Sequence, residues 1–123
     1  MANSGDQIGK QFAEHFYNTF KTNKQNLGSL YHAEAILDWE GNKHVGQQAI
    51  TQKHNSLQFG NIDFKLRTVD CQPTASSGVI VFVTGQLLTE GETKPLDFSE
   101  VFHLVQQNST WVLTNDMFRL NYG

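Results

Sequence analysis

Large hydrophobic residues near the start of the chain recur every four positions. This spacing places four of them on one stripe of a helix: Ile8, Phe12, Phe16 and Phe20. Ser4 and Gln7 form the pattern of a capping box, in which two side chains satisfy free backbone groups at a helix start. The pattern predicts a long amphipathic helix over residues 6–21.

Two shorter helices are predicted further along. Leu27, Leu30 and Tyr31 indicate a short second helix. Residues 47–57 follow a glycine and carry apolar side chains near one face, which favours a third helix. Between these helices, residues 35–39 alternate between apolar and polar like a strand, and a tight turn at residues 40–43 returns the chain beside it.

From Ile62 onward the apolar residues repeat with a period of two, which is typical of strands. Turn-rich segments separate four such stretches: residues 62–73, 79–88, 96–105 and 111–120. Helices followed by neighbouring strands predict an α+β fold, with an antiparallel sheet wrapped around the first helix. At this length we expect one domain over residues 1–123.

Several predicted strands are apolar on both faces. If one face packs against the helices, the other directs Phe82, Val101 and Met117 toward solvent. An apolar patch of that kind normally marks an association surface. The pattern therefore predicts a homodimer that forms through the sheet.

Composition narrows the function classes. The net charge of −3 and the lack of a basic cluster argue against nucleic acid as a partner. No apolar run approaches the roughly 20 residues of a membrane span, and the N-terminus lacks the features of a signal peptide, so we expect an intracellular protein. The single cysteine, Cys71, is interpreted as a strand residue rather than a nucleophile.

Sequence patterns give little support to catalysis. The five histidines have no metal-ligand spacing, and no phosphate-binding loop or nucleophile motif is present, so we expect no metal, no cofactor and no enzymatic activity. One alternative stays open. An enzyme with a curved sheet could use Asp38 or Asp116 as a general base in an apolar pocket.

Acidic residues at predicted turns form a second pattern. Glu40 follows Trp39, while Glu90 and Glu92 lie in one loop between strands. Exposed carboxylates of this kind are usually solvated surface. They also suit docking of a basic protein.

Several segments resemble the nuclear transport factor 2 family, in order and across about 115 residues. They include FAEHFYNTF in the first helix, WEG at the first turn, and TNDMFRLNYG at the C-terminus. VTGQLL and FSEVFHLV occupy the strands between them. The resemblance implies a cone-shaped α+β domain, with a strongly bent sheet around an apolar cavity and two copies paired sheet to sheet.

This resemblance also implies a function. Members of the family carry the GDP-bound form of the GTPase Ran into the nucleus and contact phenylalanine-glycine repeats of nuclear pore proteins. That role implies presence in the cytoplasm, at pore complexes of the nuclear envelope, and in the nucleoplasm. An aromatic side chain of Ran enters the cavity, and acids at its rim pair with basic residues of Ran.

Matching positions can be named in this sequence. The acidic rim falls on Glu40, Glu90 and Glu92. The positions that match the family's cavity are mostly large and apolar: Trp39, Leu57, Phe59, Ile62, Leu87, Leu96, Phe118 and Leu120. One departure concerns pore binding, because the family often places a large aromatic residue where this chain has Gly5.

Two other functions remain alternatives on the same fold. One is an enzyme such as a dehydratase or an isomerase, with Asp38 or Asp116 as the base. The other is an adaptor like the messenger-RNA export factors, which form heterodimers and bind pore proteins without Ran. The retained acids of the rim argue against the adaptor.

Overall fold

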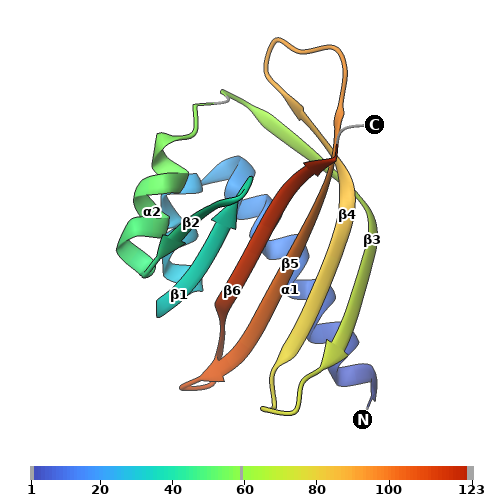
Figure 1. Cartoon of the computed structure of the whole chain (residues 1–123). Coiled ribbons are helices and arrows are strands. Elements are labelled where there is room, and N and C mark those ends of the chain that lie inside the picture. Colours follow the sequence, from blue (N-terminus) through green and yellow to red (C-terminus); the bar gives the residue numbers. More distant parts are fainter. Residues whose placement is uncertain (1, 59, 122–123) are drawn as a thin grey trace.

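A computed structural model describes residues 2–58 and 60–121 of the chain. Helices occupy the first part of the chain and long strands the second (Figure 1). The elements follow in this order: α1 (Ala2–Thr22), the 3-10 helix η1 (Lys24–Leu30), β1 (Tyr31–Trp39), β2 (Asn42–Val45), α2 (Gln47–Ser56), β3 (Ile62–Pro73), β4 (Val79–Thr89), β5 (Leu96–Gln107) and β6 (Thr110–Asn121). This arrangement confirms the predicted α+β class.

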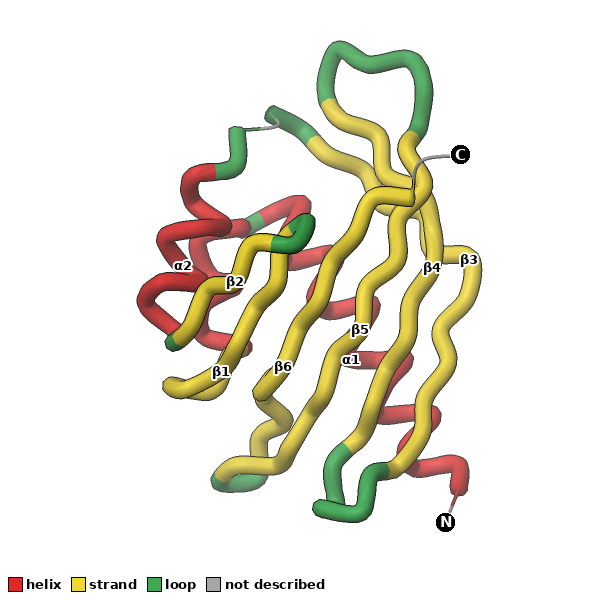
Figure 2. The backbone as a smooth tube through the Cα atoms, viewed as in Figure 1, coloured by secondary structure: helices red, strands yellow, loops and turns green. Residues whose placement is uncertain are grey.

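The strands form one six-stranded sheet in the order β2-β1-β6-β5-β4-β3. Helix α1 crosses one face of the sheet, and α2 lies beside β1 and β2 (Figures 1 and 2). Strands β3 to β6 form the predicted antiparallel meander. One detail of the prediction was wrong, because β1 pairs with β6 in parallel, with Trp39 opposite Phe118. Alternation within a strand does not indicate which distant strand becomes its neighbour.

Two predicted boundaries at the N-terminal end were also wrong. Helix α1 begins at Ala2, so Ser4 lies within the helix and does not occupy the N-cap position. Tyr31 is the first residue of β1 rather than part of the second helix. Its side chain is buried in the core and not on a helix surface. Residues near the junction of a helix and a strand fit both the helical and the strand pattern, and tertiary packing decides which structure they adopt.

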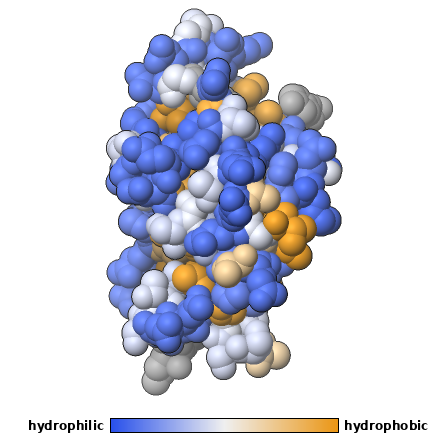
Figure 3. All heavy atoms as spheres, turned by 90° about the vertical axis from the view of Figure 1, so that its left-hand side faces the viewer, coloured by the Kyte–Doolittle hydropathy of each residue, from blue (hydrophilic) through white to orange (hydrophobic). Residues whose placement is uncertain are grey.

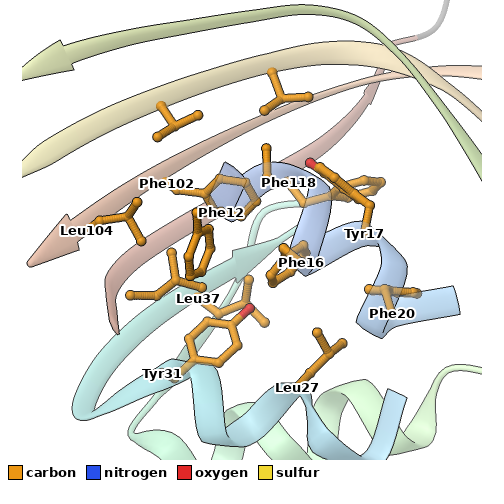
Figure 4. Close-up of a cluster of buried hydrophobic side chains, with 14 of the residues drawn as sticks. Phe12, Phe16, Tyr17, Phe20, Leu27, Tyr31, Leu37, Phe102, Leu104 and Phe118 are labelled. Carbon is orange, nitrogen blue, oxygen red and sulfur yellow. The ribbon is translucent and has the colours of Figure 1, made fainter. Parts of the chain in front are cut away.

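Aromatic side chains of α1 form the centre of the core (Figure 4). Phe12, Phe16 and Phe20 are buried, and the ring of Phe16 lies 4.8 Å from that of Phe102 on β5. Each fully buried phenylalanine contributes about 1.5–3 kcal/mol relative to an exposed one. The predicted stripe of α1 therefore holds the helix against the concave side of the sheet.

A local irregularity bends the strands beside the cavity. The pairing of β3 with β4 shifts between Leu66 and Thr68, where Gly85 faces the break. A Cβ atom at Gly85 would lie 2.4 Å from the carbonyl oxygen of Lys65, so a larger residue does not fit there. Such bulges increase the twist and bend of a sheet. The bend lets the sheet curve around the end of α1.

The surface on the side of α2 and β2 is mainly hydrophilic, with small separate hydrophobic areas (Figure 3). No helix within the described part of the chain is both long enough and apolar enough to cross a membrane.

Candidate functional site

An apolar cavity of about 250 Å³ opens at one end of the molecule. Its lining includes Phe20, close to the end of α1, and Thr89 and Leu96, which flank the loop between β4 and β5. Its wall contains a stacked aromatic pair, because the rings of Trp39 and Phe118 are nearly parallel at 4.1 Å. These two residues are neighbours through the parallel pairing of β1 with β6. The topology that the sequence did not predict therefore builds one wall of the site.

Most residues predicted to form the cavity do line it. They come from five strands or their flanking segments: Trp39, Leu57, Ile62, Leu87, Leu96, Phe118 and Leu120. Phe59, the remaining predicted lining residue, lies outside the described residues. The strands reach the cavity with their ends, so side chains far apart in the sequence converge there.

Five further lining residues were missed: Tyr17, Phe20, Phe64, Thr89 and Glu100. Two of them carried a usable signal. Phe64 lies two residues beyond Ile62 on the same strand face, and Glu100 lies between the buried Phe98 and Phe102 with the same alternation. An acid at an inward position of a strand indicates a polar group inside the core.

Glu40 lies at the mouth of the cavity and is held by the backbone. Its Oε1 accepts a hydrogen bond of 2.5 Å from the backbone N–H of Leu120. Its own N–H donates to the carbonyl oxygen of Phe118 at 3.0 Å. The residue adopts a positive φ of 52° in the tight turn after β1. These contacts fix the carboxylate beside the wall formed by Trp39 and Phe118.

Glu90 and Glu92 lie in the exposed loop after β4. Glu90 exchanges two hydrogen bonds with Asn61, accepting its N–H at Oε1 (3.0 Å) and donating to its carbonyl oxygen (2.8 Å). The backbone N–H of Glu92 donates to Thr89 in a turn. Ion pairs among the described residues use other carboxylates, those of Asp38, Asp63 and Asp97.

A second acidic feature is buried. Glu100 and Asp116 are only 2% and 1% exposed. The hydroxyl of Tyr17 donates to Oε1 of Glu100 at 2.7 Å, and the hydroxyl of Tyr31 donates to Oδ2 of Asp116 at 2.5 Å. His54 Nε2 lies 3.1 Å from the same Tyr31 hydroxyl. Glu100 lines the cavity, so this buried network reaches its interior.

Burial shifts the pKa values of this network. Loss of water raises the pKa of Asp116 to about 6. It also raises the pKa of Glu100 well above its usual range, and the nearby charge of Asp116 adds to that shift. Burial lowers the pKa of His54 to about 4, so this imidazole is neutral at pH 7. The two carboxyl groups behave as a pair that retains a proton more strongly than exposed acids do.

The structure places both acids proposed as catalytic bases away from the cavity lining. Asp38 pairs with Lys43 at 2.9 Å. Asp116 is directed into the core toward Tyr31. Glu100 is the buried acid of this network that reaches the cavity. No group of three or more His, Cys, Asp or Glu residues within the described ranges 2–58 and 60–121 is arranged to hold a metal ion.

Another apolar region lies on the outer face of the sheet, away from α1. Phe82, Val101 and Met117 are register neighbours across β4, β5 and β6. Phe82 and Met117 are 42% and 49% exposed, while Val101 is half-buried between them. Val79, Val81 and Val83 point to the opposite, buried face, as the alternation predicts. We call Phe82, Val101 and Met117 the outer patch.

Solved structures with this fold differ widely in function. A hexachlorocyclohexane dehydrochlorinase, LinA-type3 from Novosphingobium barchaimii, superposes with a TM-score of 0.78 at 10% identity, covering 98% of this chain and 92% of that one. At such low identity the similarity concerns the fold alone.

Closer similarities identify the family. The nuclear transport factor 2 domain matches residues 8–120. Nuclear transport factor 2 from Oryza sativa subsp. japonica is 44% identical over 119 residues, covering 96% of this chain and 98% of that protein. The structure of nuclear transport factor 2 from Cryptosporidium parvum superposes with a TM-score of 0.93 at 45% identity, covering 98% of both chains. The chain therefore belongs to the nuclear transport factor 2 family.

Proposed function

We propose that this protein is a nuclear import carrier that binds the GDP-bound form of Ran. The observation that carries the proposal is an apolar cavity whose mouth bears a fixed carboxylate, Glu40. An aromatic side chain of Ran enters the cavity, and basic residues of Ran pair with Glu40, Glu90 and Glu92. The family membership and the names of close relatives as transport factors support the role.

The geometry suits recognition of a protruding aromatic residue. The stacked rings of Trp39 and Phe118 offer a flat apolar wall, and Leu57, Leu87 and Leu96 surround the remaining space. Burial of an aromatic anchor in such a pocket commonly dominates the affinity of an interface. A single ring therefore contributes more than the exposed contacts around it.

The rim acids supply orientation and partner choice. Glu40 and Glu90 accept backbone hydrogen bonds, so binding does not need to order these side chains from a mobile state. Carboxylates at an interface rim mainly raise the association rate and reject acidic partners. A GTPase switch segment that presents its aromatic residue only with GDP bound then provides selectivity for the nucleotide state.

The proposed assembly is a homodimer through the outer patch. Adjacent apolar residues on three strands, two of them exposed and Val101 half-buried, offer a continuous surface for a second copy. The carrier also binds phenylalanine-glycine repeats of nuclear pore proteins. Gly5 contributes no side chain to that contact, and among the described residues no heavy atom lies within 4 Å of a Cβ built there. Weak repeat binding allows fast release during passage.

This function places the protein in the cytoplasm, at the pore complexes of the nuclear envelope, and in the nucleoplasm. It requires no catalysis, because reading the state of Ran needs differential affinity alone. An enzyme of the same fold is the second candidate function. It is favoured by one observation, a carboxyl group with a raised pKa inside the cavity, that of Glu100.

Calorimetric titration tests the import-carrier proposal. The protein is titrated with Ran loaded with GDP, and then with Ran loaded with a non-hydrolysable GTP analogue. We expect binding to the GDP form alone, and at least a hundredfold loss with Glu40→Lys. Glu34→Lys is the matched control, since Glu34 is exposed on β1, the strand that leads into the turn of Glu40, and does not line the cavity. Absence of binding in both nucleotide states would reject the proposal.

A further inference from the structure

The half-buried Glu40 has one carboxylate oxygen bonded to the backbone and one that is open. Oε1 accepts the N–H of Leu120, whereas Oε2 has no hydrogen-bond partner among the described residues. Oε2 keeps contact with solvent, because the buried unpartnered oxygens in the described part of the chain belong to other residues. The guanidinium group of Arg119 lies near Gly41 in the same turn, yet the ion pairs within residues 2–58 and 60–121 use other carboxylates. The mouth of the cavity therefore presents a fixed oxygen that can accept from a ligand.

The interior of the cavity offers no second open carboxylate. Glu100 is the other acid of the described lining, and its carboxyl group is almost completely buried. The Tyr17 hydroxyl and the carboxyl group of Asp116 engage it from the side of the core. A polar substituent deep in the cavity would therefore lose its hydration without gaining a carboxylate partner. The arrangement favours a ligand that is apolar at its inner end and carries its polar group at the mouth.

The walls of the cavity suit an aromatic ring without polar substituents. The stacked rings of Trp39 and Phe118 form a flat side, and Phe20 and Phe64 add further ring surface. A cavity of about 150 Å³ is enough for benzene, and this one is larger. Glu40 follows Trp39 directly in the chain and bonds to the backbone of Phe118. A short aliphatic linker therefore connects a ring on this wall to the carboxylate.

We propose that the cavity and Glu40 together form a binding site for small aralkylammonium ions, in which a short aliphatic linker joins an unsubstituted ring to a primary ammonium group. The ring lies against Trp39 and Phe118. The ammonium group donates to Oε2 of Glu40 at the mouth, where it keeps part of its hydration. This site goes beyond the carrier function, because it needs no partner protein. A ligand of this class and the aromatic residue of Ran would occupy the same space and exclude each other.

Selectivity follows from the different roles of the ring and the ammonium group. Burial of the ring removes apolar area from water. A hydrogen bond between an ammonium group and a carboxylate is stronger than one between neutral groups, and Glu40 is already held by Leu120, so little side-chain entropy is lost. An anion of the same shape would be repelled by Glu40. The site therefore prefers a cation over both a neutral molecule and an anion with the same ring and linker.

The test compares four ligands: phenethylamine, 2-phenylethanol, 3-phenylpropionate and butylamine, which has the ammonium group without the ring. Protein-observed NMR titration of the full chain in the absence of Ran measures their affinities, so the result is independent of the import-carrier proposal. We expect phenethylamine to bind at least tenfold more tightly than the other three, with shifts at Trp39, Glu40 and Phe118. Equal or tighter binding of any of the three, or no binding of phenethylamine, would overturn the proposal.

Variants assign the charge preference to one side chain. Glu40→Gln should reduce the preference for phenethylamine over 2-phenylethanol to less than threefold, because the amide keeps the shape of the side chain but not its charge. Glu14→Gln is the control, since it removes the same charge from an exposed position on α1 outside the cavity. Persistence of the full preference in Glu40→Gln, or its loss in Glu14→Gln, would contradict the proposal. If Glu40→Gln does not fold, the four ligands on the unchanged chain decide.

Discussion

The cavity and the outer patch lie on opposite faces of the same strands, and they differ in shape and in the charges that they carry. Both are apolar, and both use residues of β4, β5 and β6. The cavity is concave, with Glu40 fixed at its mouth and Glu100 inside. The outer patch presents Phe82, Val101 and Met117 side by side on an open surface. A concave site with placed charges selects a shape and a charge, while an open apolar surface suits a second copy of itself.

The comparison predicts a large difference in stability between the two regions. Phe118 is buried and stacked on Trp39, whereas Phe82 is 42% exposed. We expect Phe118→Ala to lower the free energy of unfolding by about 3–5 kcal/mol, because it removes buried apolar contacts. Phe82→Ala should lower it by less than about 1 kcal/mol. Urea unfolding at protein concentrations low enough to give monomers measures both values, and equal losses would contradict the comparison.

A charge in the outer patch should affect assembly without affecting the cavity. Met117→Glu places a carboxylate where the proposed dimer excludes water, and we expect at least a hundredfold weaker dimerisation. Analytical ultracentrifugation over a range of concentrations measures this effect. Gln106→Glu, an exposed position on β5 outside the outer patch, should leave dimerisation unchanged. A monomeric wild-type protein would refute this use of the outer patch.

The buried acids predict an unusual pH dependence. The folded-state pKa values of Glu100 and Asp116 are raised, so the folded chain keeps protons that the unfolded chain releases above about pH 4. Their contribution to stability is complete below that pH and is lost as the pH rises through the folded-state values, with that of Asp116 at about 6. His54 acts in the opposite direction, because its pKa is lowered to about 4 and its contribution is lost as the pH falls below 6.5.

Glu100→Gln tests the pH dependence of stability that comes from the buried acids separately from that of His54. Glutamine can accept the Tyr17 hydroxyl and donate to Asp116 without a titrating proton. We therefore expect the variant to be more stable than wild type by about 1–2 kcal/mol at pH 8 and to lose this advantage at pH 4. Thermal unfolding across this range measures the difference, and Glu14→Gln serves as the control. A constant difference at all pH values would show that Glu100 does not titrate as proposed.

Sequence patterns correctly predicted features that depend on residues close together in the chain. Period-two alternation correctly separated Val79, Val81 and Val83 from Ile80 and Phe82. The resemblance to the family located most of the cavity lining, because aligned positions carry tertiary information that alternation lacks. Neither approach predicted the parallel pairing of β1 with β6, which brings Trp39 beside Phe118. Contacts between strands some 80 residues apart depend on topology.

Buried polar contacts were the hardest part of the site to predict. Glu100 stood at an inward position between two phenylalanines, which marks it as buried but does not identify Tyr17 as its partner. Tyr31 was assigned to a helix, so its bond to Asp116 could not be foreseen. Glu40 was expected at the rim, yet its hydrogen bond to the backbone of Leu120 depends on the closed turn after β1. Side-chain direction and tertiary distance decide these contacts.

The smallest expected effect is a difference between the rim acids in how much each contributes to binding of Ran. Glu40 is held by the backbone N–H of Leu120 at the cavity mouth, whereas Glu92 lies in an exposed turn beyond Thr89. An ordered carboxylate contributes more to binding than a mobile one, since less side-chain entropy is lost. We expect Glu40→Gln to weaken binding of GDP-bound Ran about tenfold and Glu92→Gln less than threefold, measured by calorimetry at physiological salt. Both losses should shrink at high salt, because rim charges are screened. Equal losses at the two positions would show that the backbone contact of Glu40 adds nothing to recognition.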